Sequence, residues 1–93
     1  MSRPKSVDLP ANLTISTAEA LYEKFEALLL EDCDINVNAK AVERVDTAGL
    51  QLLYVFKDAL SKRNLTMKWK STSESLIEAA TQIGLSEKLE LAK

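Results

Sequence analysis

The stretch Val45-Asp46-Thr47-Ala48-Gly49-Leu50 decides the fold of this chain. Before it, apolar residues alternate with polar ones, and after it they recur with the 3.6-residue period of a helix. An aspartate ahead of a helical run is a good N-cap, because its carboxylate accepts hydrogen bonds from the first free amides. The pattern predicts a helix from Thr47 to about Arg63, with the Thr47 hydroxyl exposed and Gly49 allowing a close approach to the sheet or to a partner.

Outward from this stretch, segments with strand periodicity and segments with helix periodicity follow one another. The predicted elements are two short strands near residues 7–9 and 13–15 joined by a turn at Pro10-Ala11-Asn12, a helix over 16–31, a strand over 34–39, a strand over 65–70 and a helix over 71–83. The first two strands are expected to pair as a hairpin. Trp69 alternates inward on its strand and is interpreted as a core residue.

The expected ends of the two outer helices rest on short local patterns. Capping-box spacing predicts N-caps at Ser16 and Ser71. Gly84, followed by the apolar Leu85, is typical of a Schellman stop after the last helix. The tail over residues 85–91 is expected to add a short helix or an edge strand.

This order of elements predicts a single small α/β domain over residues 1–93. Strand-helix-strand units favour parallel strands with right-handed crossovers, and the N-terminal hairpin would make the sheet mixed. We expect a mixed, mostly parallel sheet of four to five strands, with three to four helices mainly on one side. The later strands each have one apolar and one polar face, so water should reach much of the other side.

Composition excludes several classes of function. The 14 acidic and 12 basic residues are mixed along the whole length, so no basic cluster is available for nucleic acid. The chain has no histidine and one cysteine, Cys33, which excludes histidine-dependent triads, an internal disulfide and a cysteine-based metal cluster. No cofactor or metal is expected. No stretch approaches the roughly 20 apolar residues of a membrane span, and we expect a cytoplasmic protein without direct membrane insertion.

The central stretch differs from the Asp-Thr motif of one class of enzyme. A dimeric aspartic protease carries Asp-Thr-Gly in a tight turn between strands, where two carboxylates share one proton. Here Ala48 precedes the glycine and a strong helical pattern follows. We therefore expect no catalytic residues.

The chain as a whole resembles the STAS family, which is shared by bacterial anti-sigma factor antagonists and the cytoplasmic tails of sulfate transporters. The family signature is an Asp-Ser/Thr-x-Gly-Leu turn before a helix, and residues 46–50 match it without a gap. Residues 9–21 resemble the opening strand and first helix of the family, and Gly84-Leu85 resembles its terminal Gly-Leu. The resemblance implies a non-enzymatic regulatory domain that binds a protein partner.

The resemblance to the antagonists implies a role for Thr47 in signalling. In these proteins the matching residue is phosphorylated by a kinase-type anti-sigma factor, and only the unmodified form binds that partner. Thr47 is therefore the candidate phosphorylation site, although spacing alone favours a purely structural role for the stretch. Asn12, Thr14 and Asn38 occupy positions where the family often has acids near the switch, and this difference favours docking over phosphorylation.

A second branch of the family also fits, namely the STAS subunit of Mla-type lipid-transport ABC complexes. The chain resembles this subunit through Arg44-Val45-Asp46-Thr47, Gly49-Leu50 and Leu52-Leu53. The resemblance then implies that Thr47 lies in an interface with the ATPase and needs no phosphate chemistry. An adaptor in another kinase-linked signalling system is a third alternative.

The partner surface is predicted to extend along the outer side of the helix that follows Asp46. Tyr54 and Val55 lie there, although solvent alone would favour polar residues at these positions. The expected partner-binding residues are Asp46, Thr47, Ala48, Gly49, Gln51, Tyr54, Val55, Asp58, Asn12, Thr14 and Asn38.

Overall fold

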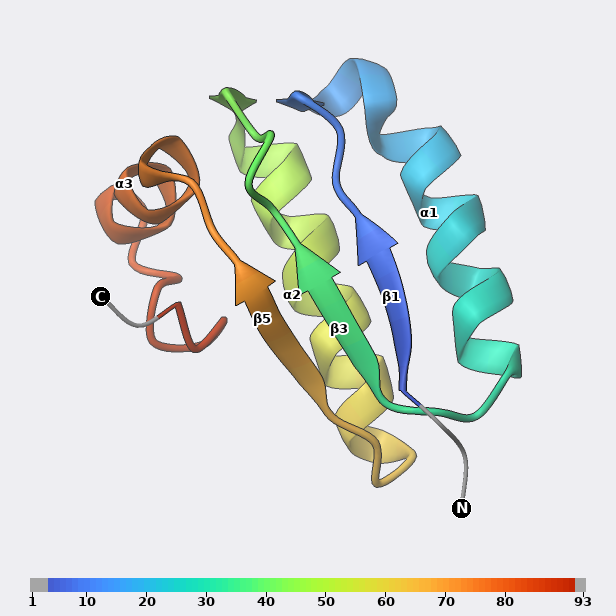
Figure 1. The fold of residues 1–93 in the computed structure, drawn as a ribbon. Coiled ribbons are helices and arrows are strands. Elements are labelled where there is room, and N and C mark those ends of the chain that lie inside the picture. Colours follow the sequence, from blue (N-terminus) through green and yellow to red (C-terminus); the bar gives the residue numbers. More distant parts are fainter. Residues whose placement is uncertain (1–3, 92–93) are drawn as a thin grey trace.

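A computed structural model describes residues 4–91 of the chain and contains five strands and three helices (Figure 1). The elements are β1 (Lys5–Asp8), β2 (Asn12–Leu13), α1 (Ile15–Leu30), β3 (Ile35–Asn38), β4 (Arg44–Val45), α2 (Thr47–Lys62), β5 (Met67–Ser71) and α3 (Glu74–Gln82). The predicted α/β class and mostly parallel sheet are confirmed. The short strand β4 was not predicted as an element of its own.

The strands form two small parallel sheets. The first has the order β1-β3-β5, and the second pairs β2 with β4. The predicted N-terminal hairpin is wrong, because β1 pairs with β3 and β2 pairs with β4, both in parallel. Pro10 and its neighbours carry the chain from one sheet to the other instead of turning it back on itself.

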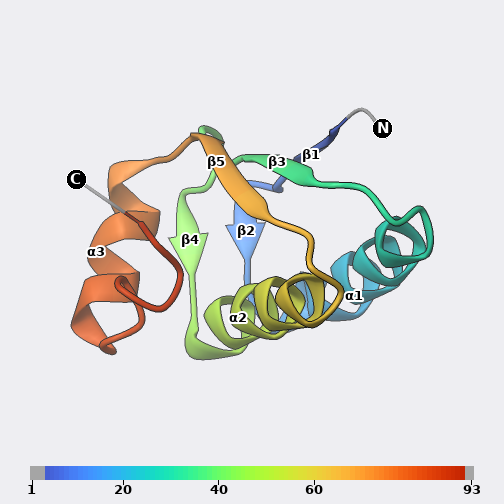
Figure 2. The ribbon, with the colours of Figure 1, turned by 90° about the horizontal axis from the view of Figure 1, so that it is seen from below.

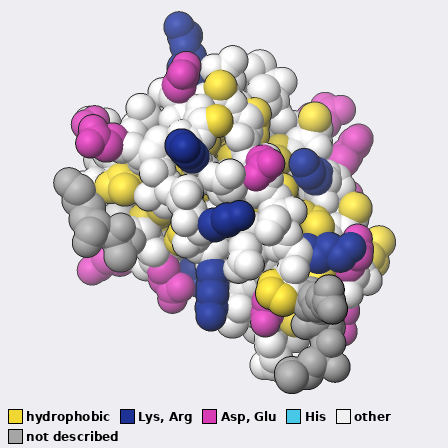
Figure 3. Space-filling view, in the orientation of Figure 1, with side chains coloured by type: hydrophobic (Ala, Val, Ile, Leu, Met, Phe, Trp, Pro, Cys, Tyr) yellow, Lys and Arg dark blue, Asp and Glu magenta, His cyan; other side chains and the backbone are white. Residues whose placement is uncertain are grey.

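Helices α1 and α2 cover one face of the β1-β3-β5 sheet, and α3 lies at its side next to β4 (Figure 2). The apolar side chains of the strands point toward the helices, and Val7, Ile35 and Val37 are at most 2% exposed. The opposite face carries polar side chains and scattered lysines (Figure 3). The expected one-sided layering is therefore confirmed.

The N-cap of the first helix lies two residues before the predicted one. Thr14 is the N-cap of α1, and the hydroxyl of Thr17 accepts a hydrogen bond from the Thr14 N–H at 3.2 Å. The same hydroxyl donates to the Asn12 carbonyl oxygen at 2.7 Å. Ser16 instead lies inside the first turn of the helix. A threonine at the third helical position closes the cap here, whereas the usual pattern has Glu or Gln.

The predicted N-cap at Ser71 is also wrong. Ser71 belongs to β5, where its carbonyl oxygen accepts a hydrogen bond from the Ala39 N–H at 2.8 Å. Ser73 caps α3 and accepts from the Leu76 N–H at 3.2 Å. The sheet ladder therefore extends β5 past the position at which local spacing would start the helix.

The C-terminal part of the chain ends α3 as predicted and then packs against the core. Gly84 has φ +78°, and the Leu85 N–H donates to the Ala80 carbonyl at 2.8 Å, which completes the Schellman stop. The tail that follows is a series of turns and not the expected helix or edge strand. The Trp69 indole N–H donates to the Leu89 carbonyl at 2.7 Å, and Leu89 is fully buried. Trp69 thus packs against the core, as predicted.

Two kinds of feature are absent from the residues that the structure describes. Within residues 4–91, no helix has the length and apolar character needed to cross a membrane. The same residues contain no group of three or more Cys, Asp or Glu side chains placed to hold a metal ion.

Candidate functional site

The Asp46 side chain joins the starts of two helices. Its Oδ1 atom accepts a hydrogen bond from the Gly49 N–H at 2.9 Å, which caps α2 as predicted. Its Oδ2 atom accepts from the Ile15 N–H, also at 2.9 Å, at the first residue of α1. One carboxylate therefore satisfies free amides of both helices and fixes their N-terminal ends side by side.

These two contacts also set the protonation state of Asp46. Hydrogen bonds from the backbone amides of Gly49 and Ile15 lower the pKa of the Asp46 carboxyl from its ordinary value of 3.8. An ionised carboxylate with both oxygens engaged is a poor base toward the neighbouring Thr47 hydroxyl. The arrangement holds and presents Thr47 and does not activate it as a nucleophile.

The lowered pKa predicts an acid-dependent loss of stability that runs through Asp46. Below its ordinary pKa the unfolded chain protonates this carboxyl while the folded chain keeps it ionised, so the free energy of unfolding decreases as the pH falls. Asp46→Asn replaces one accepting oxygen by a donor and should be less stable than wild type at neutral pH. Urea unfolding at about pH 6 and about pH 3 should show the difference between the two proteins shrinking at the lower pH. A difference independent of pH would contradict this origin of the stability.

Gly49 allows α2 to approach β2 closely. A Cβ atom built on Gly49 would lie 2.1 Å from the Leu13 carbonyl oxygen. No residue with a side chain fits there without a shift of the backbone. Gly49 is buried, so its place in the predicted site is structural: it brings the start of α2 against the strand that leads into α1.

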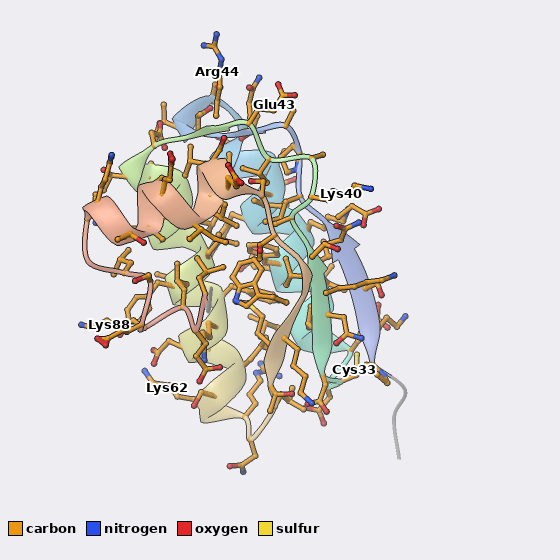
Figure 4. The ribbon with its side chains drawn as sticks, turned by 60° about the vertical axis from the view of Figure 1, so that its left-hand side comes forward. Cys33, Lys40, Glu43, Arg44, Lys62 and Lys88 are labelled. Carbon is orange, nitrogen blue, oxygen red and sulfur yellow. The ribbon has the colours of Figure 1, made fainter. Side chains whose placement is uncertain are left out.

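Thr47 lies at the first position of α2 and is exposed, as predicted. The flanking Asp46 and Ala48 are half-buried. The segment before the helix is also accessible, because Glu43 and Arg44 are exposed and project outward from the body of the protein (Figure 4). Thr47 therefore lies on an open surface whose backbone is held in place by the Asp46 bonds.

Three residues, Asn12, Thr14 and Asn38, were expected near Thr47. The structure places two of them close to the start of α2. Asn12 pairs with Arg44 in the β2-β4 sheet, and Thr14 directly precedes the Ile15 amide that Asp46 binds. Asn38 lies elsewhere: it ends β3 in the main sheet, and β2 and β4 run from that sheet toward the helix starts (Figure 2). Its side chain accepts a hydrogen bond from the Lys40 N–H at 3.1 Å.

The exposed residues of α2 lie next to two different parts of the protein, the C-terminal tail and α1. Gln51 and Asp58 are exposed on its outer surface. Tyr54, 37% exposed, lies toward the C-terminal tail, where the Lys88 ammonium is 5.8 Å from its ring centroid. Val55, 55% exposed, lies toward α1, where it lines a hollow between the helices. Tyr54 and Val55 thus belong to adjacent but different parts of the surface.

Ile15 was missed by sequence reasoning. It was assigned to the apolar face of an early strand, but it begins α1 and is 72% exposed next to Asp46. The signal that could have found it is the Thr14-x-x-Thr17 spacing, which starts the helix two residues earlier than Ser16 does.

Comparison with known proteins adds one finding. The family model described as Mlab, STAS domain, matches residues 2–91 of the chain. No curated protein matches the chain.

Proposed function

The chain belongs to the Mlab STAS domain family, and from this premise we propose that residues 1–93 form one domain that docks on a protein partner through the start of α2. STAS domains are in general regulatory or binding domains that mediate protein–protein interactions, and not enzymes. The docking surface of this proposal consists of Asn12, Thr14, Asp46, Thr47, Ala48, Gln51, Tyr54, Val55 and Asp58. Gly49 is buried beneath this surface and packs against Leu13 of β2.

The observation that carries this proposal is the double contact of Asp46. By binding the amides of Ile15 and Gly49 it holds two helix starts in one rigid unit, and Thr47 is exposed at the edge of that unit. A preorganised surface loses little conformational entropy on binding, which favours affinity. Val55 of this surface and the exposed Ile15 beside the surface supply apolar contacts on either side.

Two classes of partner fit this surface. The Mlab description of the matching family supports the ATPase of a lipid-transport ABC complex, which would contact Thr47 directly. The exposure of Thr47 at a helix N-terminus supports a kinase-type signalling partner, because a phosphate there would be accommodated by the helix and would add about two negative charges to the interface. Both classes act in the cytoplasm, where we place the protein.

A Thr47→Glu variant is expected to lose the partner. Glu adds both bulk and charge at Thr47, near the centre of the docking surface, and this should weaken binding about tenfold or more. Affinity capture from the native cell extract, followed by mass spectrometry, should recover an ABC ATPase or a kinase-type protein with wild type and far less of it with Thr47→Glu. The same spectra would show whether Thr47 carries phosphate.

Thr66→Glu is a matched control. Thr66 is exposed just before β5, at the end of the molecule opposite the start of α2 (Figure 1). This variant should capture the partner as wild type does, with circular dichroism verifying that both variants are folded. Equal loss of the partner in both variants, or equal capture by both, would contradict docking through the start of α2. Phosphorylated Thr47 together with a kinase would favour signalling, whereas an unmodified Thr47 with an ATPase would favour transport.

A further inference from the structure

The outer surface of the α1–α2 pair contains an apolar groove that the start of α2 does not account for. The two helices lie side by side on one face of the sheet (Figure 2), and between them is a hollow of about 160 Å³. Its floor is formed by Phe25 and Phe56, whose rings stack at 4.0 Å. Tyr22 and Leu29 line the α1 side, and Leu52 and Val55 line the α2 side.

The side chains of this groove are more exposed than a closed core would leave them. Tyr22 is 48% exposed and Val55 is 55% exposed, while Leu29 and Leu52 are half-buried. Leu30, 80% exposed, lies at the end of α1 outside the lining of the hollow. A contiguous apolar surface of this kind, bordered by charged residues, is typical of an interaction site.

The charges along the groove have one sign on the α1 side. Glu19, Glu23 and Glu26 recur at helical spacing on the outward side of α1, and all three are exposed. Lys24, the one basic residue of α1, falls on the other side of the helix by the same periodicity. The α1 border of the groove is therefore a row of three carboxylates with no basic residue among them.

The basic residues at the far end of the groove are already engaged. Lys62 forms an ion pair with Asp58 at 3.2 Å, and the Arg63 guanidinium donates to the Leu29 carbonyl at 3.0 Å. Asp58 offsets the charge of Lys62, and the single charge of Arg63, whose partner is a neutral carbonyl, is smaller than that of the three carboxylates on the α1 border. An occupant of this groove would need an apolar side for the floor and positive charges for the border.

We propose that the α1–α2 groove binds an amphipathic helix of a partner protein whose apolar stripe is flanked by Lys or Arg. The residues that line the groove lie within 22–29 of α1 and 52–59 of α2, which corresponds to about 12 Å at 1.5 Å per residue, so the groove can hold about two turns of such a helix. Apolar residues at helical spacing would fill the groove, and the basic flank would face Glu19, Glu23 and Glu26. This surface shares Val55 with the docking surface described above but does not include Thr47, and the proposal does not depend on the function proposed above.

The test uses two labelled model peptides of about 18 residues, roughly five helical turns. Both carry the same leucine stripe, one with lysines along its flank and the other with glutamates. Fluorescence anisotropy should show binding of the basic peptide and little of the acidic one. Amide chemical shifts should change for α1 and α2 and not for the open face of the sheet.

Two triple variants make the charge argument specific. Changing Glu19, Glu23 and Glu26 together to Gln should lower the affinity for the basic peptide about tenfold and reduce the salt dependence of binding. Changing Glu43, Glu78 and Glu87 together to Gln alters the net charge by the same amount away from the groove, and should leave the affinity unchanged. Matching unfolding midpoints would verify that both variants fold.

Several outcomes would overturn the proposal. Equal weakening by the two triple variants would mean attraction to net charge alone. Shift changes confined to the sheet face would place the peptide elsewhere. If the protein self-associates in sedimentation equilibrium and the peptide prevents this, the occupant of the groove would be a second copy of the chain. A normal peptide affinity in Thr47→Glu is expected, so failure here and failure of the docking proposal at Thr47 are distinguishable.

Discussion

Replacing Gly49 by alanine is expected to lower the free energy of unfolding by about 3 kcal/mol or more, at the upper end of overpacking effects. The added Cβ would lie 2.1 Å from the Leu13 carbonyl oxygen, 2.7 Å from its carbonyl carbon and 2.9 Å from its Cγ. Two of these three atoms are backbone, so a side-chain rotation cannot relieve the overlap. The start of α2 would have to move off β2, which also disturbs the hydrogen bonds of Asp46.

Thermal unfolding monitored by circular dichroism measures this effect. A domain of this size loses about 4–8 °C in Tm for each kcal/mol, so Gly49→Ala should unfold about 12 °C or more below wild type. Gly84→Ala is the matched control, because no atom lies within 4 Å of its Cβ position and only its φ of +78° is unfavourable. That strain costs about 1 kcal/mol. If Gly49→Ala were no less stable than Gly84→Ala, the close approach would not be as described.

Phe56→Ala is expected to cost about 3–5 kcal/mol, the usual range for removing a buried aromatic ring. Phe56 of α2 and Phe25 of α1 are each 2% exposed, and their rings stack at 4.0 Å with 7° between the planes. This pair is the centre of the contact between the two helices. Without one ring, a cavity opens between the two helices.

Urea unfolding of a double-mutant cycle would show that the two rings act on each other. Phe25→Ala and Phe56→Ala together should cost less than the two separate losses added, because the stacking contact can be lost only once. Ile83→Ala is a control in an exposed position, 42% exposed at the end of α3, and should lie within about 0.5 kcal/mol of wild type. Strict additivity of the two phenylalanine variants would contradict a direct contribution from the stack.

Much of the architecture was predictable because its causes are local. The apolar period of α2 and the cap at Asp46 lie within one continuous stretch, and Gly84 stops α3 through bonds to residues a few positions away. The polar alternation on β3 and β5 likewise indicated that one face of the sheet is open. The predicted hairpin failed because the alternation around Pro10 indicates strands without identifying their partners.

The candidate site was predicted in its residue types more fully than in its geometry. The exposure of Thr47 follows from its position in the first turn of α2, whereas Gly49, which was expected among the partner-binding residues, is buried against β2. The grouping of Asn38 with this surface followed from family resemblance, but the structure places Asn38 at the end of β3 in the main sheet. The separation of Tyr54 toward Lys88 and Val55 toward α1 depends on which elements pack beside α2.

The sequence by itself determined the helices, the polar and apolar faces of the strands and the two glycine positions, because each depends on neighbours within one or two turns of chain. Tertiary structure alone decided that β2 pairs with β4 and that Asp46 binds Ile15, 31 positions away. Such contacts join residues that are far apart in the sequence, and local sequence patterns do not indicate which distant residues will meet. They form only when the apolar faces of helices and strands are buried together, and that burial places two helix starts beside one carboxylate.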